Sequence, residues 1–110
     1  MENNIFEEVV RKNILEVAQA LGIDPNLPYD QLEEEVRAHW PAHVAVLYKK
    51  QRKAHERAIA FTEEWRYRYN PPDVRRKTNR LWDKSIKLFL KFMHEEFSWW
   101  EEVTRDHEER

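Results

Sequence analysis

The segment RYRYNPPDVRRK, residues 66–77, decides the fold, because it separates two long helical patterns. No proline or glycine occurs in residues 42–69 or in residues 73–104. Pro71 and Pro72 cannot continue a helix, and Asp73 is a residue type that caps the start of one. We therefore predict helices at 42–69 and 73–104. Because the loop between them is short, they must fold back on each other as an antiparallel hairpin.

Two shorter helices are predicted before the hairpin. Gly22 follows ILEVAQAL and precedes IDPNLP, a pattern typical of a helix C-terminus, so the first helix should span residues 4–21. Asp30 and Glu33 have capping-box spacing, which predicts a second helix at 30–39, and Pro41 suits the first turn of the third. The predicted fold is one all-α domain, residues 1–110: an elongated helical bundle built on the hairpin and covered by the two N-terminal helices.

Apolar residues of the predicted hairpin fall at helical spacing. Ala54 and Ala58 should lie opposite residues 84–88, where small side chains allow the helices to approach closely. The same stripe of the third helix continues through Leu47, Phe61, Trp65 and Tyr69.

The fourth helix carries two apolar stripes instead of one. The first holds Leu81, Leu88, Phe92 and Trp99, and the second holds Trp82, Ile86, Phe89, Met93, Phe97 and Trp100. Together they cover an arc of about 200°, which is too wide for one antiparallel neighbour. Either the third helix covers one stripe and the N-terminal helices the other, or a second chain covers one of them.

Charge is strongly segregated along the chain. Residues 1–40 contain nine acids and three bases, residues 41–91 fourteen bases and five acids, and residues 92–110 seven acids and two bases. The middle block therefore has a net charge of +9, although the whole chain has a net charge of −2. A protein of nearly neutral total charge can thus present a basic surface.

Two candidate basic sites lie in this middle block. A ridge along the fourth helix consists of Arg76, Arg80, Lys84, Lys87 and Lys91, which share one face of about 80°. A patch at the hairpin tip consists of Arg66, Tyr67, Arg68, Tyr69, Arg75 and Lys77. Four interpretations are open: a solvated helix back, a surface neutralised by the acidic N-terminal block, a docking surface for an acidic protein, or a site for nucleic-acid backbone.

The aromatic cluster Phe97, Trp99 and Trp100 has two possible roles. Aromatic stripes at helical spacing usually belong to a core. If the fourth helix extends beyond its neighbours, the same residues would instead be interface anchors, because tryptophan is enriched among binding hot spots. Homodimerisation through this end is the simplest form of the second role.

Catalytic and metal-binding patterns are weak. The chain has no cysteine, and its single glycine excludes a glycine-rich phosphate loop. Glu35, His39 and His43 would share a face of one helix, but Pro41 interrupts it. No Glu-x-x-His pair of the di-iron bundle type occurs. We expect no enzyme activity, no metal and no cofactor.

These patterns lead to a functional expectation. The acidic N-terminus is unlike a signal peptide, and no segment approaches the roughly 20 apolar residues of a membrane span, so we expect a cytoplasmic protein without membrane contact. We expect a small non-enzymatic interaction protein, such as an adaptor, inhibitor or assembly subunit. It would bind a protein partner or a second copy through charged helix faces and the aromatic end. The alternative is a nucleoprotein subunit that binds DNA or RNA backbone through the ridge and the tip.

Overall fold

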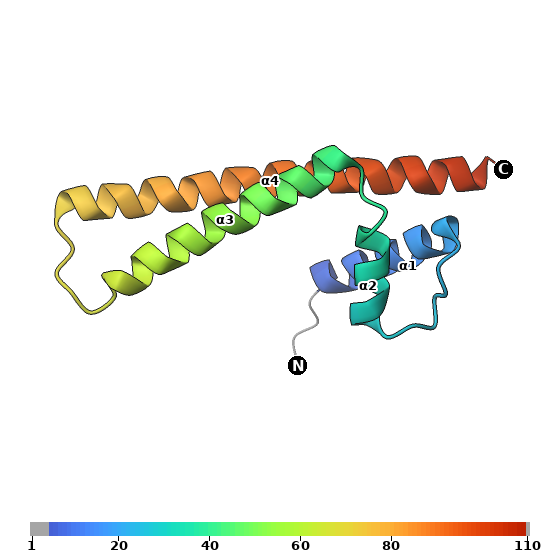
Figure 1. Ribbon diagram of the computed structural model, residues 1–110, viewed down its shortest axis with the longest axis horizontal. Coiled ribbons are helices and arrows are strands. Elements are labelled where there is room, and N and C mark those ends of the chain that lie inside the picture. Colours follow the sequence, from blue (N-terminus) through green and yellow to red (C-terminus); the bar gives the residue numbers. More distant parts are fainter. Residues whose placement is uncertain (1–4, 110) are drawn as a thin grey trace. The chain divides into compact units, whose positions relative to one another are not determined.

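The computed structural model describes residues 5–109, which form four helices and no strand (Figure 1). They are α1 (Ile5–Leu21), α2 (Tyr29–Arg37), α3 (Ala42–Glu64) and α4 (Pro72–Glu108). The prediction of an all-α fold built on a helical hairpin is confirmed, although the predicted first residue of helix one, residue 4, lies outside the described range. The chain divides into two compact units, one of residues 42–95 and one made of the residues before and after them, so α4 contributes to both.

The first unit is the hairpin itself, in which α3 runs antiparallel to residues 72–95 of α4 (Figure 1). Its interior is a narrow row of mostly small side chains: Val44, Ala54, Ala58, Val74, Ser85 and Phe92 are all buried. Ala54 and Ala58 are 7% and 0% exposed, in keeping with their predicted position between the helices. Small residues at this interface allow the two backbones to approach closely.

Aromatic contacts fix one side of the hairpin. The indole Nε1 of Trp82 donates a hydrogen bond of 2.9 Å to Oγ1 of Thr62 on α3. The ring of His55 meets the same indole edge-on, with the ring centroids 5.7 Å apart. A tilted contact of 5.4 Å joins the rings of Tyr48 and Phe92. Trp82, the first residue of the predicted second stripe, and Phe92 of the first stripe are therefore both directed to α3.

The third helix ends at Glu64 and not at Tyr69 as predicted. The chain turns there through two backbone hydrogen bonds between residues three positions apart. The N–H of Arg66 donates to the carbonyl of Glu63, and the N–H of Arg68 donates to the carbonyl of Trp65. Asn70 precedes a proline, which disfavours helical backbone at this point, and the helix unwinds before reaching it. As a result Tyr69 is 82% exposed and does not extend the apolar stripe.

The start of α4 also differs from the prediction. The N–H of Arg75 bonds to the carbonyl of Pro71, so the helix begins at Pro72. Asp73 consequently lies within the first turn and not at the cap. In the first turn its negative charge still interacts favourably with the positive end of the helix dipole. The helix continues to Glu108, four residues beyond the predicted end.

The second unit contains α1, α2 and the last turns of α4. Its core consists of Ile14, Val17, Ala18, Ile23, Leu32, Val36, Trp99 and Trp100. Gly22 ends α1 as predicted: its φ is 77°, and the N–H groups of Gly22 and Ile23 bond back to the carbonyls of Gln19 and Ala18. Glycine accommodates this left-handed conformation without the steric cost of a Cβ.

The predicted capping box of α2 is wrong. The helix starts at Tyr29 after an N-cap at Pro28, and no side chain bonds to the cap. Because the helix begins earlier than predicted, Asp30 lies inside its first turn. The helix ends at Arg37, and Nδ1 of His39 lies 3.0 Å from the carbonyl oxygen of Glu35 in the last turn.

Trp99 and Trp100 are 8% and 5% exposed and belong to the core of this unit. Phe97 packs against that core and meets the ring of Trp100 at 4.9 Å in an edge-to-face arrangement. The structure therefore places these rings in or against a core, which is the first of the two roles considered for them. An interface anchor at the two tryptophans would have no exposed ring to use.

We expect Trp100→Ala to lower the free energy of unfolding by about 3–5 kcal/mol, because it removes a large buried ring and leaves a cavity. Urea unfolding followed by circular dichroism measures this change. Tyr67→Ala is the matched control, since that ring is 90% exposed and its loss should cost less than about 0.5 kcal/mol. Equal effects of the two substitutions would contradict the assignment of Trp100 to the core.

Candidate basic docking groove

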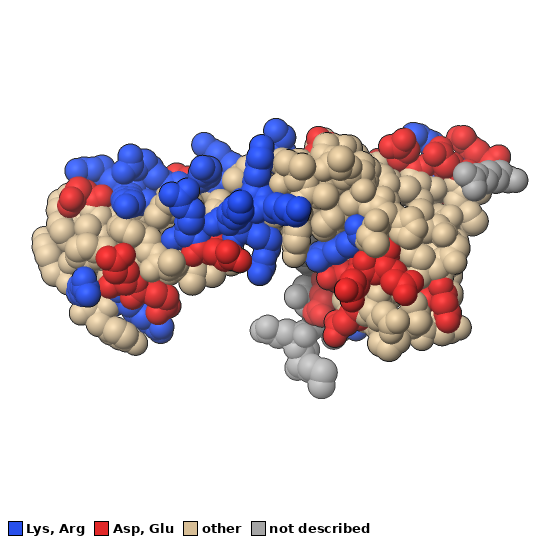
Figure 2. Space-filling model, viewed as in Figure 1, with Lys and Arg blue, Asp and Glu red and all other residues tan. Residues whose placement is uncertain are grey.

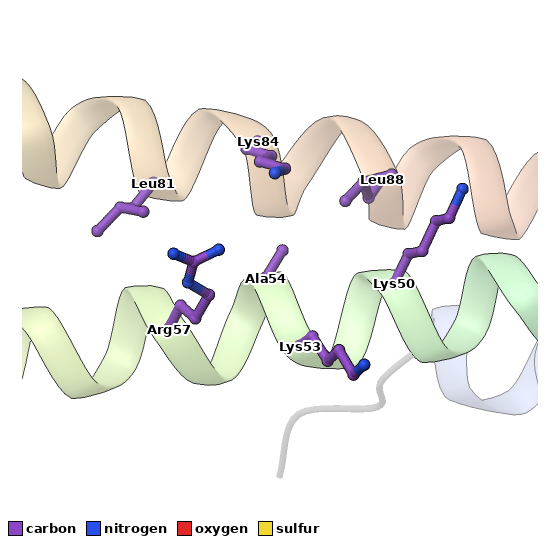
Figure 3. A pocket seen from close by; sticks show the side chains of 7 residues that line it. All are labelled: Lys50, Lys53, Ala54, Arg57, Leu81, Lys84 and Leu88. Carbon is purple, nitrogen blue, oxygen red and sulfur yellow. The ribbon is translucent and has the colours of Figure 1, made fainter.

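A groove of about 690 Å³ lies between α3 and α4 of the hairpin (Figure 3). Its lining residues are Lys50, Lys53, Ala54 and Arg57 of α3 and Leu81, Lys84 and Leu88 of α4. Ala54 points from α3 toward α4, and Leu81 and Leu88 point from α4 toward α3, so aliphatic side chains form the floor (Figure 3). The four cations stand along the two rims. We call this set of seven residues the basic groove.

Helical spacing explains why these side chains share one groove. Residues 50, 53, 54 and 57 of α3 follow the i, i+3, i+4, i+7 pattern of one helix face, and residues 81, 84 and 88 follow it on α4. Each row spans about 10 Å, or two helical turns. The groove thus results from two matched faces that the hairpin loop brings into register.

No acidic residue lines the basic groove. Within residues 42–95, its four cations form no ion pair and lie over no aromatic ring. A neighbouring cation of α3 does pair, because Arg52 lies 3.9 Å from Glu56. The positive charge of the groove is therefore left uncompensated by the hairpin.

A second hollow of about 460 Å³ adjoins the groove and shares Lys84 and Leu88 with it. Arg80, Asp83 and Lys87 complete its lining. Three members of the predicted ridge, Arg80, Lys84 and Lys87, thus lie beside these hollows, whereas Arg76 and Lys91 are exposed outside their linings. Lysine and arginine side chains gather over the hairpin accordingly (Figure 2).

Lys50, Lys53 and Arg57 were not among the predicted site residues. They belong to the basic block that the charge count identified, and their spacing places them on one face of α3. Their membership of a groove depends on which residues of α4 lie opposite, which helical periodicity on one helix does not give.

The tip patch surrounds the loop between α3 and α4. Tyr67 and Tyr69 are 90% and 82% exposed. The guanidinium of Arg66 lies 5.4 Å from the ring centre of Tyr67. The guanidinium of Arg68 lies 5.7 Å from the ring centre of Trp65. Lys77 stands 4.6 Å from the ring centre of Phe61. The predicted patch residues therefore share this end of the hairpin, with two rings open to solvent.

The two histidines considered for metal binding, His39 and His43, contact other groups instead. His39 lies against the end of α2, and His43 faces Glu95. Over the described part of the chain, no group of three or more potential ligands comes together. None of its helices is sufficiently long and apolar to cross a membrane.

One buried acid has a strongly altered pKa. Glu96 is 7% exposed, and burial raises its pKa to about 7. The charge of Arg37 and a 3.0 Å hydrogen bond donated by Nε1 of Trp40 act in the opposite direction, while Glu33 raises the pKa further. Burial and the Glu33 charge also raise the pKa of Tyr29, to about 12.

Comparison with protein-family models, with curated proteins and with solved structures finds no match to this chain. The function proposed below therefore rests on the residues and geometry of the chain itself.

Glu96 predicts a pH dependence of stability. Its pKa is higher in the folded chain than its ordinary value of 4.5, so between pH 4.5 and 7 the folded state binds more protons. Its contribution to the free energy of unfolding should therefore fall by about 3 kcal/mol as the pH rises through this range.

Glu96→Gln keeps an acceptor for Trp40 and removes the titration, so the variant should become more stable than the unaltered chain as the pH rises from 5 to 7. Urea unfolding at several pH values measures the difference, and Glu101→Gln, an exposed acid on the same helix, is the control. Parallel pH profiles for Glu96→Gln and the unaltered chain would refute the assignment.

Proposed function

We propose that this chain is a small non-enzymatic interaction protein whose basic groove binds an acidic segment of a protein partner. The observation that supports this most directly is the groove's composition: four cations without acidic partners among residues 42–95, above a floor of Ala54, Leu81 and Leu88. Such a protein would serve as an adaptor, an inhibitor or an assembly subunit. The lack of cysteine in the sequence supports a cytoplasmic location.

The aliphatic floor favours a protein partner over nucleic acid in this groove. Nucleic acid bound without sequence preference uses aromatic rings for base stacking, and no aromatic residue lines the groove. A leucine-type side chain would instead gain about 25 cal/mol for each Å² of apolar surface buried on the floor. Carboxylates on either side of it would meet the lysine and arginine rims.

An amphipathic helix has the required chemistry. Helices bound in grooves use anchors at i, i+3 or i+4, and i+7, a length of two turns that matches the roughly 10 Å lining. Acidic residues beside those anchors would complement the rims and accelerate encounter. The aromatic end, also considered as a docking element, has no part in this proposal, because Trp99 and Trp100 are buried.

A synthetic peptide of about four helical turns, with leucine at helical spacing and glutamate beside it, tests the proposal. Arg57→Glu with Lys84→Glu should weaken its binding by about tenfold or more, since attraction becomes repulsion at both rims. Fluorescence anisotropy of the labelled peptide measures the dissociation constant.

Two controls accompany this titration. Lys49→Glu with Arg76→Glu makes the same change in net charge outside the lining of the groove. A scrambled peptide of identical composition lacks the apolar ridge. If the control variant loses as much affinity, or if the scrambled peptide binds equally well, general charge attraction and not the groove accounts for binding.

A second candidate function is single-stranded nucleic-acid binding at the hairpin tip. The exposed rings of Tyr67 and Tyr69, set among arginines, favour it, because base stacking on aromatic side chains combines with cationic contact to the backbone. Residues 42–95 carry fourteen Lys and Arg against six Asp and Glu, a net charge of +8.

This second function predicts that Tyr67→Ala with Tyr69→Ala weakens binding of a labelled single-stranded oligonucleotide by about fivefold or more, through loss of stacking. Tyr67→Phe with Tyr69→Phe keeps both rings and should bind as the unaltered chain does. Affinity should also fall steeply between low and high salt as counterions are released. Unchanged affinity in the alanine variant would exclude stacking at the tip.

A further inference from the structure

The chain passes from one compact unit to the other twice, once before Ala42 and once after Glu95. Each unit contains a contact that joins the two passages. In the second unit, Nε1 of Trp40 donates a hydrogen bond of 3.0 Å to Oε2 of Glu96. In the hairpin, Nε2 of His43 lies 3.4 Å from Oε2 of Glu95. We call Trp40, His43, Glu95 and Glu96 the junction clasp.

The carboxyl of Glu96 lies where a negative charge is unfavourable. Its side chain is buried, and a buried carboxylate is costly unless a cation compensates it. Arg37 on α2 lowers its pKa, but Arg37 also lies 3.2 Å from Glu33, which acts in the opposite direction. Burial has the largest effect and raises the pKa of Glu96 to about 7. The closed arrangement therefore holds a neutral carboxyl in mild acid and a buried charge at alkaline pH.

The groups that face Glu96 come from α2 and, through Tyr29, from α1. Glu33 and Arg37 of α2 act on it directly. Tyr29 is neutral throughout this pH range, because burial raises its pKa to about 12, and Arg11 of α1 lies 4.8 Å from its ring centre. The positions one turn away on α4 itself are all apolar: Phe92, Met93, Trp99 and Trp100. Glu96 is therefore the member of this cluster whose charge changes near neutral pH.

The second contact of the clasp responds to pH in the same direction. His43 forms an ion pair with Glu95 only while its imidazole is protonated, and histidine is the side chain that commonly changes charge between about pH 5 and 8. On α3 the positions one turn after His43 are Val46 and Leu47, which carry no charge, and on α4 Lys91 lies one turn before Glu95. Mild acid thus favours both contacts, because one gains an ion pair there and the other avoids a buried charge.

We propose that the connection between α2 and α3, residues 38–41, is a pH-sensitive strap, which the junction clasp holds against α4 in mild acid and releases at alkaline pH. On release the ionised carboxylate of Glu96 turns to water and the indole of Trp40 loses its acceptor. Neutral His43 no longer attracts Glu95. Release exposes the ring of Trp40, which packs against the core of the second unit while the strap is closed. None of the clasp residues lines the basic groove.

Spin labels on the full chain test this opening, because the sequence has no cysteine of its own. Ala38→Cys with Ser98→Cys places one label on the strap and one on α4, both at exposed positions. Double electron–electron resonance should give a narrow distance distribution at about pH 6 and a longer, broader one at about pH 8. The midpoint of the change should lie near pH 7, where Glu96 titrates.

Two controls separate opening of the strap from unfolding. Gln19→Cys with Glu102→Cys labels exposed positions of α1 and α4 in the same unit, and its distance distribution should be the same at both pH values. Circular dichroism of the labelled chains should show equal helix content at both pH values.

A locked variant tests the role of the clasp. Glu96→Gln with His43→Lys removes both titrations, because glutamine keeps an oxygen acceptor for Trp40 and lysine remains charged beside Glu95. Its strap should stay closed at alkaline pH. Glu101→Gln with His107→Lys makes the same two replacements at exposed positions of α4 outside the clasp and should open as the unaltered chain does.

Any of three results would overturn the proposal. The first is an identical distance distribution at both pH values in the labelled chain with an unaltered clasp. The second is opening that persists in Glu96→Gln with His43→Lys. The third is an equal change in the Gln19 and Glu102 pair, or a loss of helix content at alkaline pH, because the whole unit would then unfold and not the strap alone.

Discussion

A hairpin of two helices can bury only one stripe of each, and the surfaces of this protein follow from that constraint. Ala54, Ala58 and Ser85 fill the shared interior with small side chains, which allow two helices to approach closely. The wide apolar arc of α4 cannot be covered by α3 alone. The outer surface of the hairpin includes cations over an aliphatic floor, and also exposed isoleucine, leucine and phenylalanine side chains.

Charge segregation sharpens the difference between the two units. Residues 42–95 carry a net charge of +8, and the rest of the chain carries five bases and fifteen acids, a net charge of −10. These charges cancel to −2 for the whole chain, which conceals them in the isoelectric point of about 6.2. Each unit therefore has a strong charge of its own while the protein as a whole remains nearly neutral. The absence of acids from the groove lining is the feature on which the proposed binding of an acidic segment rests.

Local patterns predicted the helices well because their causes are local. Gly22 ends α1 through its own positive φ, and the two prolines at 71 and 72 stop any helix that reaches them. The predicted end of α3 was five residues too late. The helix ends before the prolines in turns closed by hydrogen bonds between residues three positions apart, and helical periodicity in the sequence does not reveal such turns. The capping box at Asp30 failed for a similar reason, since the helix starts after Pro28 instead.

Tertiary features were harder to predict from one sequence. The ridge prediction named Lys84 but not its neighbours Lys50, Lys53 and Arg57, because their proximity depends on the register between two helices. Trp99 and Trp100 could be assigned to a core or to an interface until the packing of α1 and α2 was known. Charge and periodicity located the basic surface, and only the paired helices showed it to be a groove.

The central claim is that the basic groove is the site proposed to bind an acidic segment, and an NMR titration tests it most directly. Amide resonances of the labelled full chain would be followed while the leucine and glutamate peptide is added. The account predicts shifts in residues 50–57 and 81–88 that are largest at the groove positions, with little change at Ile59 and Leu90. Shifts centred on the exposed residues Ile86, Phe89 and Leu90, on the tip loop or on residues before Pro41 would contradict it.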